Sequence, residues 1–482
     1  MTLEGGDLSI GGAVYGGYSV DGDGTVHNER AFTNNTLNLN GYRGSVTGIY
    51  NFENYNWILP KDVINNDTLI KITGANNVQL NGTQHAVSME NDGNRLKAGD
   101  TVTLIDKAEG NPTLTANNVK QGHFLVYDAS LKTSGDELVL SIDSDAHSNP
   151  ASKAFLEGKA ASLAFAKQGA DLVSDYGINA AQSSLEQGKK DGNDLNLTPF
   201  AAVNGGSSRY STGSHVEVRG FNMIFGVATG LDFQDQSALT LGLFVEHGDG
   251  SYDSYNSFTN EGAVHGTGNV RYTGGGALFR LDVAGTGPTK ATVSKTGNRE
   301  GLYVEGSVRS GNSNFSFDSN DLTDGEAVRG QYHSKSKYYG AHGGVGYILN
   351  LDDKQIVDVY SRYTWLKQDG DTVSIGNDKL RLDSAESSRL RVGGRYSYVY
   401  TPRIKPYVGA AYEHEFKGDV SGSAYDLAIE KPTLSGNTGI FEVGVSMNPL
   451  ASKEALSIDL GVQGYVGVRE GGSATLKAKY TF

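Results

Sequence analysis

Histidine and aspartate, placed close together, can carry out acid–base chemistry. Polar segments of the C-terminal half hold His215, His247, His265 and His333 together with Asp249 and Asp253. A histidine beside an aspartate can activate a water molecule for hydrolysis, so these six residues are candidates for a hydrolytic site. The same residue types in polar loops are usually only solvated, and that alternative is the simpler one.

Sequence signatures of other enzymes are absent. The chain lacks the Gly-x-Ser-x-Gly and Gly-Asp-Ser-Leu blocks of serine hydrolases, the His-Glu-x-x-His pair of zinc peptidases and the P-loop. Asp21-Gly22-Asp23-Gly24 is similar to the start of a calcium loop, but no glutamate follows at the twelfth position, so we expect a turn. Cysteine is absent, which removes thiolate metal sites. We therefore expect no catalytic residue, no metal and no cofactor, and a protein that is not an enzyme.

Charged residues of both signs instead recur at every second position of strand-like segments. In the segment 386–400, for example, Arg389, Arg391 and Arg395 share one face, and Leu390 and Val392 share the other. A wall that meets lipid on one side and a water-filled pore on the other requires this alternation. A soluble antiparallel sandwich with one solvated face alternates in the same way. The residues expected to line the pore are Glu246, Glu305, Arg309, Asp358, Arg362, Arg389, Arg391, Arg395, Glu413, Glu415, Glu442 and Asp459.

The lengths of the connections favour a transmembrane antiparallel β-barrel over a sandwich. We expect about twelve strands, at 197–206, 216–232, 237–248, 266–282, 299–310, 332–350, 355–367, 386–400, 404–417, 437–448, 454–467 and 472–482. Turns near 233–237, 350–355, 400–404 and 448–453 are short, whereas connections near 248–265, 310–332, 367–385 and 417–436 are long and polar. Short periplasmic turns that alternate with long outer loops are typical of outer-membrane barrels, and only the long connection 283–298 departs from the rule.

Composition permits such a barrel. The mean hydropathy is -0.39, the formal net charge is -14, and no run of 18 apolar residues occurs, so a helical membrane protein is excluded. A barrel strand crosses lipid in about 9–11 residues, of which only every second one must be apolar. The acidic balance argues against nucleic acid as a partner.

An alanine-rich helix is expected before the barrel, within a linker at 145–195. Asn149 suits the N-cap and Pro150 the first helical position. Charges such as Lys153, Glu157 and Lys159 prevent this helix from spanning lipid, but it could thread a polar pore. An exposed or packed linker helix is the alternative. The residues expected to fill the pore are Phe155, Leu156, Ala160, Leu163, Ala164, Gln168 and Leu172.

Residues 1–144 have a different character, with short strands such as 37–39 and 78–80 separated by Asn-Gly turns. This pattern predicts a right-handed parallel β-solenoid (β-helix) fragment, although no strict sequence period is visible. The segments 68–72, 101–105 and 138–142 are expected to form a more regular closing module. Because the first residues show neither a basic region nor an apolar one, we expect a mature or truncated product whose export signal lay upstream.

The last residues carry a further signal. Residues 474–482 alternate to a final aromatic residue, Phe482. The stretch 152–158 through 168–172 is similar to the linker helix of monomeric autotransporters of type V secretion, and 44–52 followed by 57–60 looks like the end of their passengers. The order of solenoid, helix and barrel (196–482) resembles that family over nearly the whole chain.

The resemblance implies a monomeric protein in the outer membrane of a Gram-negative bacterium, whose barrel lets its own passenger reach the cell surface. It also implies periplasmic chaperones and a barrel assembly machinery that reads Leu476, Tyr480 and Phe482. An adhesin-like passenger would contact molecules of host or neighbouring cells. Some members release the passenger at an Asn-Asn step in the helix. No such pair lies in 150–190, so we expect the passenger to stay attached.

Two other readings stay open on the sequence alone. The first is an outer-membrane barrel enzyme, which would lose activity when His247 or Asp249 is changed. The second is a plugged porin-like channel, which would show a large, steady conductance.

Overall fold

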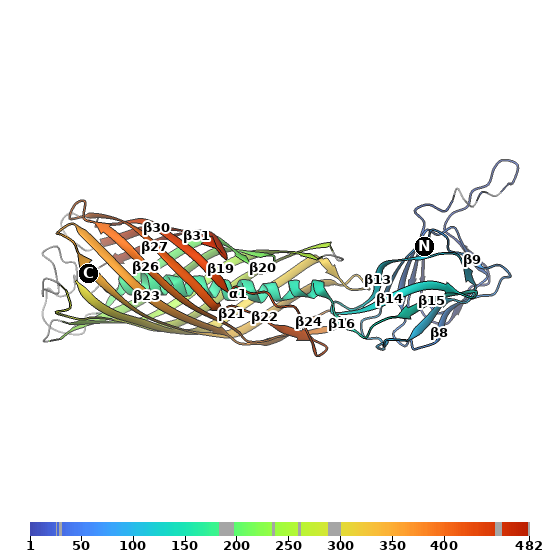
Figure 1. Ribbon diagram of the computed structural model, residues 1–482, viewed down its shortest axis with the longest axis horizontal. Helices are drawn as coiled ribbons and strands as arrows, with labels where there is room; N and C mark the ends of the chain where they lie inside the picture. The colour runs from blue at the N-terminus through green and yellow to red at the C-terminus, as the bar shows by residue number, and fades with distance from the viewer. Residues whose placement is uncertain are drawn as a thin grey trace.

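The computed structural model describes residues 1–25, 27, 31–182, 197–233, 237–258, 262–287, 300–448 and 456–480. Three parts follow one another along the longest axis (Figure 1). A small β-domain lies beyond one end of a β-barrel, and a helix runs from that domain into the barrel. Among the described residues, no helix is both long enough and apolar enough to cross a membrane.

The N-terminal domain is a short parallel solenoid with three faces. Its first face stacks β1 (Thr2–Glu4), β4 (Thr36–Asn40), β7 (Asn54–Leu59), β10 (Gln84–Met89) and β13 (Thr113–Gln121) in parallel. The second face stacks β2 (Leu8–Ser9), β5 (Gly44–Val46), β8 (Asp67–Ile72) and β11 (Thr101–Ile105), and the third holds the pairs β3 (Ala13–Tyr15) with β6 (Gly48–Tyr50) and β9 (Val78–Gln79) with β12 (Ala108–Glu109). Aromatic and aliphatic side chains such as Tyr55 and Trp57 fill the interior.

An antiparallel end closes this solenoid. β13 pairs with β14 (Leu125–Ser134), β14 with β15 (Glu137–Ile142), and β15 with β11. Of the three segments predicted to form a closing module, only 138–142 is antiparallel to all its neighbours. The segments 68–72 and 101–105 form β8 and β11, which stack in parallel as rungs, and β11 also pairs with the antiparallel strand β15.

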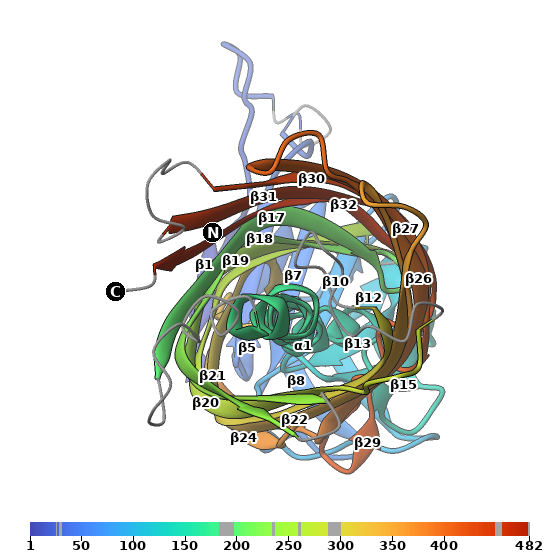
Figure 2. The same ribbon diagram turned by 90° about the vertical axis from the view of Figure 1, so that its left-hand side faces the viewer.

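The C-terminal part is a closed barrel of twelve antiparallel strands, which confirms the predicted count. In order around the wall they are β17 (Thr198–Ser211), β18 (His215–Asp232), β19 (Ala238–Phe258), β20 (Gly262–Asp282), β21 (Gly301–Thr323), β22 (Arg329–Asn350), β23 (Gln355–Gln368), β26 (Ala385–Tyr398), β27 (Ile404–Lys417), β30 (Gly436–Met447), β31 (Leu456–Gly467) and β32 (Arg469–Tyr480). Pairing of β17 with β32 closes the wall around the helix (Figure 2).

Four predicted outer loops are not open loops. The segments 248–265 and 310–332 are mostly hairpin extensions, because β19, β20, β21 and β22 run 21–23 residues. Outside lipid both faces of a strand can be polar, so hydrophobic alternation fades there although the pairing continues. The segments 367–385 and 417–436 contain a small sheet of β24 (Asp371–Ile375), β25 (Asp378–Leu382), β28 (Gly422–Ala424) and β29 (Leu427–Ala428), hereafter the outer sheet. The turns 234–236 and 449–455 and the connection 288–299 lie outside the described residues.

The helix starts where the sequence predicts. The side chain of Asn149 accepts a hydrogen bond of 3.0 Å from the backbone N–H of Ala151, and a 3-10 turn (Pro150–Ser152) leads into α1 (Lys153–Leu172). A π-turn (Val173–Gly177) follows, and residues 178–182 are again helical. All twenty residues of α1 are buried. Residues 183–195 of the expected linker lie outside the described part.

Candidate functional site: the helix-filled lumen

Two aspartates of the helix bind arginines of the barrel wall at the centre of the lumen. Asp171 Oδ1 accepts from Arg389 Nη1 at 2.9 Å and from Arg391 Nη2 at 3.0 Å, and its Oδ2 accepts from Arg469 Nη1 at 2.9 Å. Asp175, one helical turn further, accepts from Arg391 Nη1 at 2.6 Å and from Arg362 Nη1 at 2.9 Å. Arg362 lies on β23, Arg389 and Arg391 lie on β26, and Arg469 lies on β32.

Carboxylates of the wall hold the same arginines from the other side. Arg362 Nε donates to Glu305 at 2.7 Å, and Arg391 Nε donates to Glu413 at 2.9 Å. A buried charge is costly unless it is paired and hydrogen-bonded. Arg362, Arg389 and Arg391 each bridge a helix aspartate and a wall glutamate. Arg469 binds Asp171 and the hydroxyl of Ser208. The helix therefore supplies a carboxylate to every one of these four buried arginines. We call Asp171, Asp175, Arg362, Arg389, Arg391, Arg469, Glu305 and Glu413 the central network.

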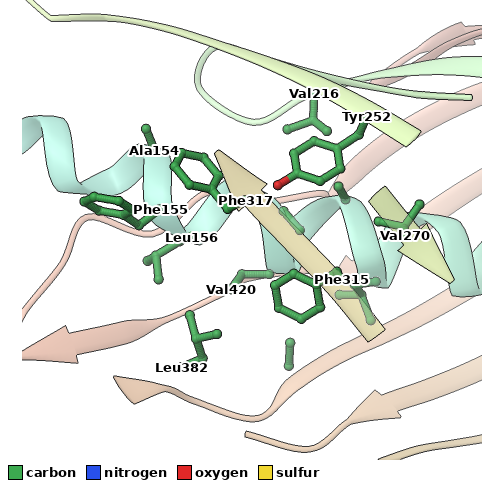
Figure 3. Packing of buried hydrophobic residues seen from close by; sticks show 14 of the residues in the cluster. Ala154, Phe155, Leu156, Val216, Tyr252, Val270, Phe315, Phe317, Leu382 and Val420 are labelled. Carbon is green, nitrogen blue, oxygen red and sulfur yellow. The ribbon is translucent and has the colours of Figure 1, made fainter. Parts of the chain in front are cut away.

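An aromatic cluster packs around the first turn of the helix. Phe155 contacts Phe124 of the solenoid end and Phe317 of β21, with ring centroids 5.2 and 5.3 Å apart. Figure 3 shows Phe155 and Leu156 on α1 surrounded by Val216, Tyr252, Phe315 and Phe317 of the wall and by Leu382 and Val420 of the outer sheet and its flank. This end of the lumen is therefore closed by apolar packing.

Small residues occur where the wall approaches the helix most closely. A Cβ atom added to Gly169 would lie 2.1 Å from the hydroxyl of Tyr272, and one added to Gly158 would lie 2.7 Å from the hydroxyl of Tyr252. Such distances are far inside van der Waals contact. The bore of the barrel thus accommodates this helix without spare room.

The other end of the helix is held by apolar and polar contacts. Leu172, Val173 and Ile178 pack with Phe200, Ile224, Phe244 and Leu278 of the wall. The hydroxyl of Tyr176 donates to Glu442 at 3.0 Å, and Glu442 also pairs with Arg395 at 2.8 Å. The lumen is consequently filled along the described length of the helix.

Comparisons with known proteins agree with this architecture. A model of the autotransporter β-domain family matches residues 200–461. This chain belongs to the autotransporter family. The curated relatives include Autotransporter CRAC of Citrobacter rodentium (26% identical over 220 residues, 44% of this chain and 12% of that protein) and the adhesin/invasin TibA of Escherichia coli (24% over 205 residues, 41% and 18%). The autotransporter chain described here thus spans 12% and 18% of the length of these two relatives.

Solved structures similar to this autotransporter include the transport unit of AIDA-I from Escherichia coli, at a TM-score of 0.47 and 17% identity over 64% of this chain and 98% of that one. The translocator domain of NalP from Neisseria meningitidis gives a TM-score of 0.46 and 14% identity over 66% and 98%. The family match and the closed barrel make this autotransporter an outer-membrane β-barrel protein of a Gram-negative bacterium.

The predicted pore-lining residues of the autotransporter all lie on the lumen side of the wall. Besides those already placed, Glu246 accepts from Arg309 at 2.9 Å, Asp358 from Tyr303 at 3.0 Å, and Asp459 from Tyr407 at 2.9 Å, while Glu415 pairs with Lys167 of the helix. The predicted helix residues Phe155, Leu156, Ala160, Leu163, Ala164, Gln168 and Leu172 are at most 6% exposed.

Several residues of the site were missed by the sequence prediction. Asp171, Asp175 and Arg469 belong to the central network, and Lys167 joins the helix to Glu415. The spacing of Asp171 and Asp175 by four residues, which places both on one helix face, was a usable signal. No comparable sequence signal pointed to Arg469, because this residue occupies the first position of its strand.

The six rim residues of the autotransporter do not form a hydrolytic arrangement with one another. His247 contacts the Thr273 hydroxyl at 2.9 Å, Asp249 pairs with Arg271, and Asp253 pairs with Arg219. His215 contacts Arg209 at 3.0 Å, and His265 contacts Asp321 at 2.9 Å. His333 is exposed on β22. These side chains lie on the outward face of the extended strands, away from the helix.

The C-terminal residues are placed in part. Leu476 of β32 faces outward and is 45% exposed, as a lipid-facing residue should be. Tyr480 is the last residue of β32, and Phe482 lies outside the described residues.

The end of the solenoid contacts the barrel of the autotransporter directly. Asn91 donates to Asp324 at 3.3 Å, and the guanidinium of Arg95 lies 4.9 Å from the ring centre of Tyr425, whose hydroxyl donates to Asp378. Gly122 has a φ of 62°, and a Cβ there would lie 1.9 Å from Asn91 Oδ1. The solenoid therefore rests on the outer sheet and on the hairpin of β21 and β22 through close polar contacts.

Proposed function

We propose that this barrel delivers its own N-terminal domain to the cell surface and that the helix then remains in the lumen as a plug. The observation that carries the proposal is the central network, in which Asp171 and Asp175 of a fully buried helix bind four arginines of the wall. A chain segment whose two aspartates pair with four buried arginines of the lumen suits the final, resting position of an exported polypeptide.

The direction of export follows from the two ends of the barrel. The solenoid lies at the end that carries the long hairpins and the outer sheet (Figure 1). The tight turns at 350–355 and 400–404 lie at the opposite end, and short turns face the periplasm in bacterial barrels. Residues 1–148 are thereby assigned to the cell surface.

The passenger's role is also a proposal. A short polar solenoid suits adhesion to molecules of host or neighbouring cells, and one relative is described as an adhesin/invasin. We infer that the chain acts without catalysis. We also infer that the passenger stays attached, because residues 150–190 contain no Asn-Asn step. Domain limits at 1–144, 145–195 and 196–482 remain our working division.

Assembly of the barrel is assigned to Leu476, Tyr480 and Phe482, which we infer are read by the assembly machinery after delivery by periplasmic chaperones. Changing Leu476 to serine and deleting Phe482 should lower the folded, heat-modifiable barrel in the outer membrane. Changing Leu460, an outward-facing residue of β31, to serine is the matched control. If both changes lower the yield equally, the residues serve only as lipid-facing wall.

The decisive experiment adds a secretory signal and an N-terminal epitope and treats intact Gram-negative cells with protease. Loss of the epitope, while a barrel-sized fragment and a periplasmic marker persist, would support delivery to the surface. An epitope that is protected until the outer membrane is broken would place residues 1–148 in the periplasm and refute the proposal.

Conductance separates this function from that of a porin-like channel. The full chain in a planar bilayer should conduct poorly, and removal of residues 151–182 should open a steady pore. A large, steady conductance of the full chain would favour the channel instead.

A further inference from the structure

The outer wall of β22 and β23 carries three lysines without a carboxylate partner among the described residues. Lys335 and Lys337 are exposed on the outward face of β22, and Lys367 is half-buried on the outward face of β23. Lys367 lies opposite Tyr339 in the register of the two strands, so Lys337 is its diagonal neighbour at about 7–8 Å between Cα atoms. We call these three residues the lysine cluster.

Four other cations on the outer wall pair with carboxylates. Arg219 pairs with Asp253, Arg271 with Asp249, Arg329 with Asp318 at 3.0 Å, and Lys417 with Glu386 at 3.3 Å. Within the described part of the chain, two carboxylates lie beside the lysine cluster without forming an ion pair with its ammonium groups. Glu386 is opposite Lys367 in the register of β23 and β26, but its carboxylate pairs with Lys417. Asp371 accepts from the Ser334 hydroxyl and from the backbone N–H of Lys335.

The cluster lies directly beyond the aromatic part of the wall. On β22, the outward-facing residues towards the outer end are, in order, Val345, Tyr339, Lys337 and Lys335. On β23 they are Val359, Tyr363, Trp365 and Lys367. Aromatic side chains mark the membrane interface in barrels. Successive residues on one face of a strand are about 7 Å apart, so the ammonium groups lie at the level of the lipid headgroups.

We propose that the lysine cluster binds the phosphate groups of a lipid in the outer leaflet. A lysine ammonium group on its flexible side chain binds phosphate as a point charge. Three such groups provide enough positive charge to bind a headgroup that carries two phosphates. A basic cluster next to a membrane gains about 1 kcal/mol per lysine, a factor of about five each, from anionic lipid. This interaction goes beyond export of the passenger and orients the outer sheet relative to the membrane.

Lipid binding by the purified full-length protein tests the proposal. Native mass spectrometry in detergent would measure retention of diphosphoryl lipid A and of the same glycolipid without phosphates. The triple variant Lys335→Gln, Lys337→Gln, Lys367→Gln should bind diphosphoryl lipid A on the order of a hundredfold more weakly. The corresponding triple change to arginine should bind as the unmodified protein does.

The matched control is Lys354→Gln, Lys379→Gln, Lys431→Gln, which removes the same charge from the turn at 350–355 and from the outer sheet and its connection. This control should bind normally. Equal binding by the lysine-cluster glutamine variant, or equal retention of the dephosphorylated glycolipid, would overturn the proposal. Displacement by millimolar inorganic phosphate alone would show a free-ion site and overturn the lipid assignment. Heat modifiability checks that each variant is folded, and none of these outcomes depends on whether the passenger is exported.

Discussion

His123 and Asp378 are 255 residues apart in the chain and meet in full burial where the passenger rests on the outer sheet. The same oxygen of Asp378 accepts from the backbone N–H of His123 at 2.9 Å and lies 3.0 Å from its Nδ1, while Nε2 lies 3.0 Å from the carbonyl of Val328. Both ring nitrogens thus face oxygen acceptors. The contact fixes the connection between β13 and β14 of the solenoid to the outer sheet of the barrel.

Changing Asp378 to alanine should loosen this contact. The change removes the acceptor of the His123 backbone N–H and of its Nδ1, and a buried polar group left unsatisfied typically costs about 1–3 kcal/mol. We expect faster proteolysis within residues 143–152 on intact cells, measured as the rate of passenger release. Asp383→Ala, which removes a half-buried partner of the exposed Arg381 directly after β25, is the control. Equal rates in both variants would show that the contact does not restrain the passenger.

Neutralising the helix aspartates should open the lumen. The double change Asp171→Asn and Asp175→Asn leaves four buried arginines with fewer acceptors, and their mutual repulsion then favours water over the helix. Single-channel recordings should show frequent openings that the unmodified chain lacks. Ser174→Ala, a neighbouring change without loss of charge, should leave the recordings quiet. A closed double variant would mean that apolar packing alone holds the plug.

Enlarging Gly169 should dislodge the helix sterically. The Cβ of alanine would lie 2.1 Å from the Tyr272 hydroxyl, which is itself held by Asn222 at 2.9 Å. Overpacking of this kind typically costs about 1–3 kcal/mol. We expect a lower unfolding temperature and higher conductance, and partial rescue by Tyr272→Ala. Gly343→Ala, with nothing within 4 Å, should change neither property. Failure of Tyr272→Ala to rescue would contradict the steric account.

The passenger should lose stability in acid through His85. Burial lowers the pKa of His85 from 6.5 to about 3. Trp57 Nε1 donates to Nδ1 of His85 at 3.1 Å, so protonation of Nδ1 would break this hydrogen bond. The unfolded chain, with the ordinary pKa, takes up the proton first. Stability is therefore complete above about pH 6.5 and falls by about 1.4 kcal/mol per pH unit as the pH drops towards 3.

Denaturant titrations followed by tryptophan fluorescence between pH 7 and pH 4 would measure this fall. His85→Gln, which keeps an acceptor and a donor but does not titrate there, should flatten the profile in that window. An unchanged slope in the variant would assign the acid sensitivity to other groups.

The barrel could be predicted from sequence because its determinants are local. Alternation such as Leu239, Leu241 and Leu243 against Thr240 and Gly242 reports directly which face meets lipid. The outer limits of the strands could not be predicted. Beyond residue 248 the outward positions of β19 become polar, so Ser251 and Asp253 read as a loop while the backbone still pairs with β20.

The solenoid gave a weaker signal because its rungs differ in length. The partners Leu37, Tyr55, His85 and Leu114 stack in register, yet they are 18, 30 and 29 residues apart in sequence. No fixed period exists for a pattern search to detect. The partners within the central network were equally hidden, because which arginine meets Asp171 depends on the rotation and depth of the helix in the lumen.

The seating of the helix also decides where mechanical force enters the membrane. The twenty residues of α1 rise about 30 Å, roughly the thickness of the hydrocarbon core. Tension on a passenger that grips another cell would pull along this helix, and its aspartates would transfer the pull to β23, β26 and β32 midway through the wall. The strands, rather than a surface loop, would then bear the strain of adhesion, and the attached domain would hold under flow for as long as those ion pairs last.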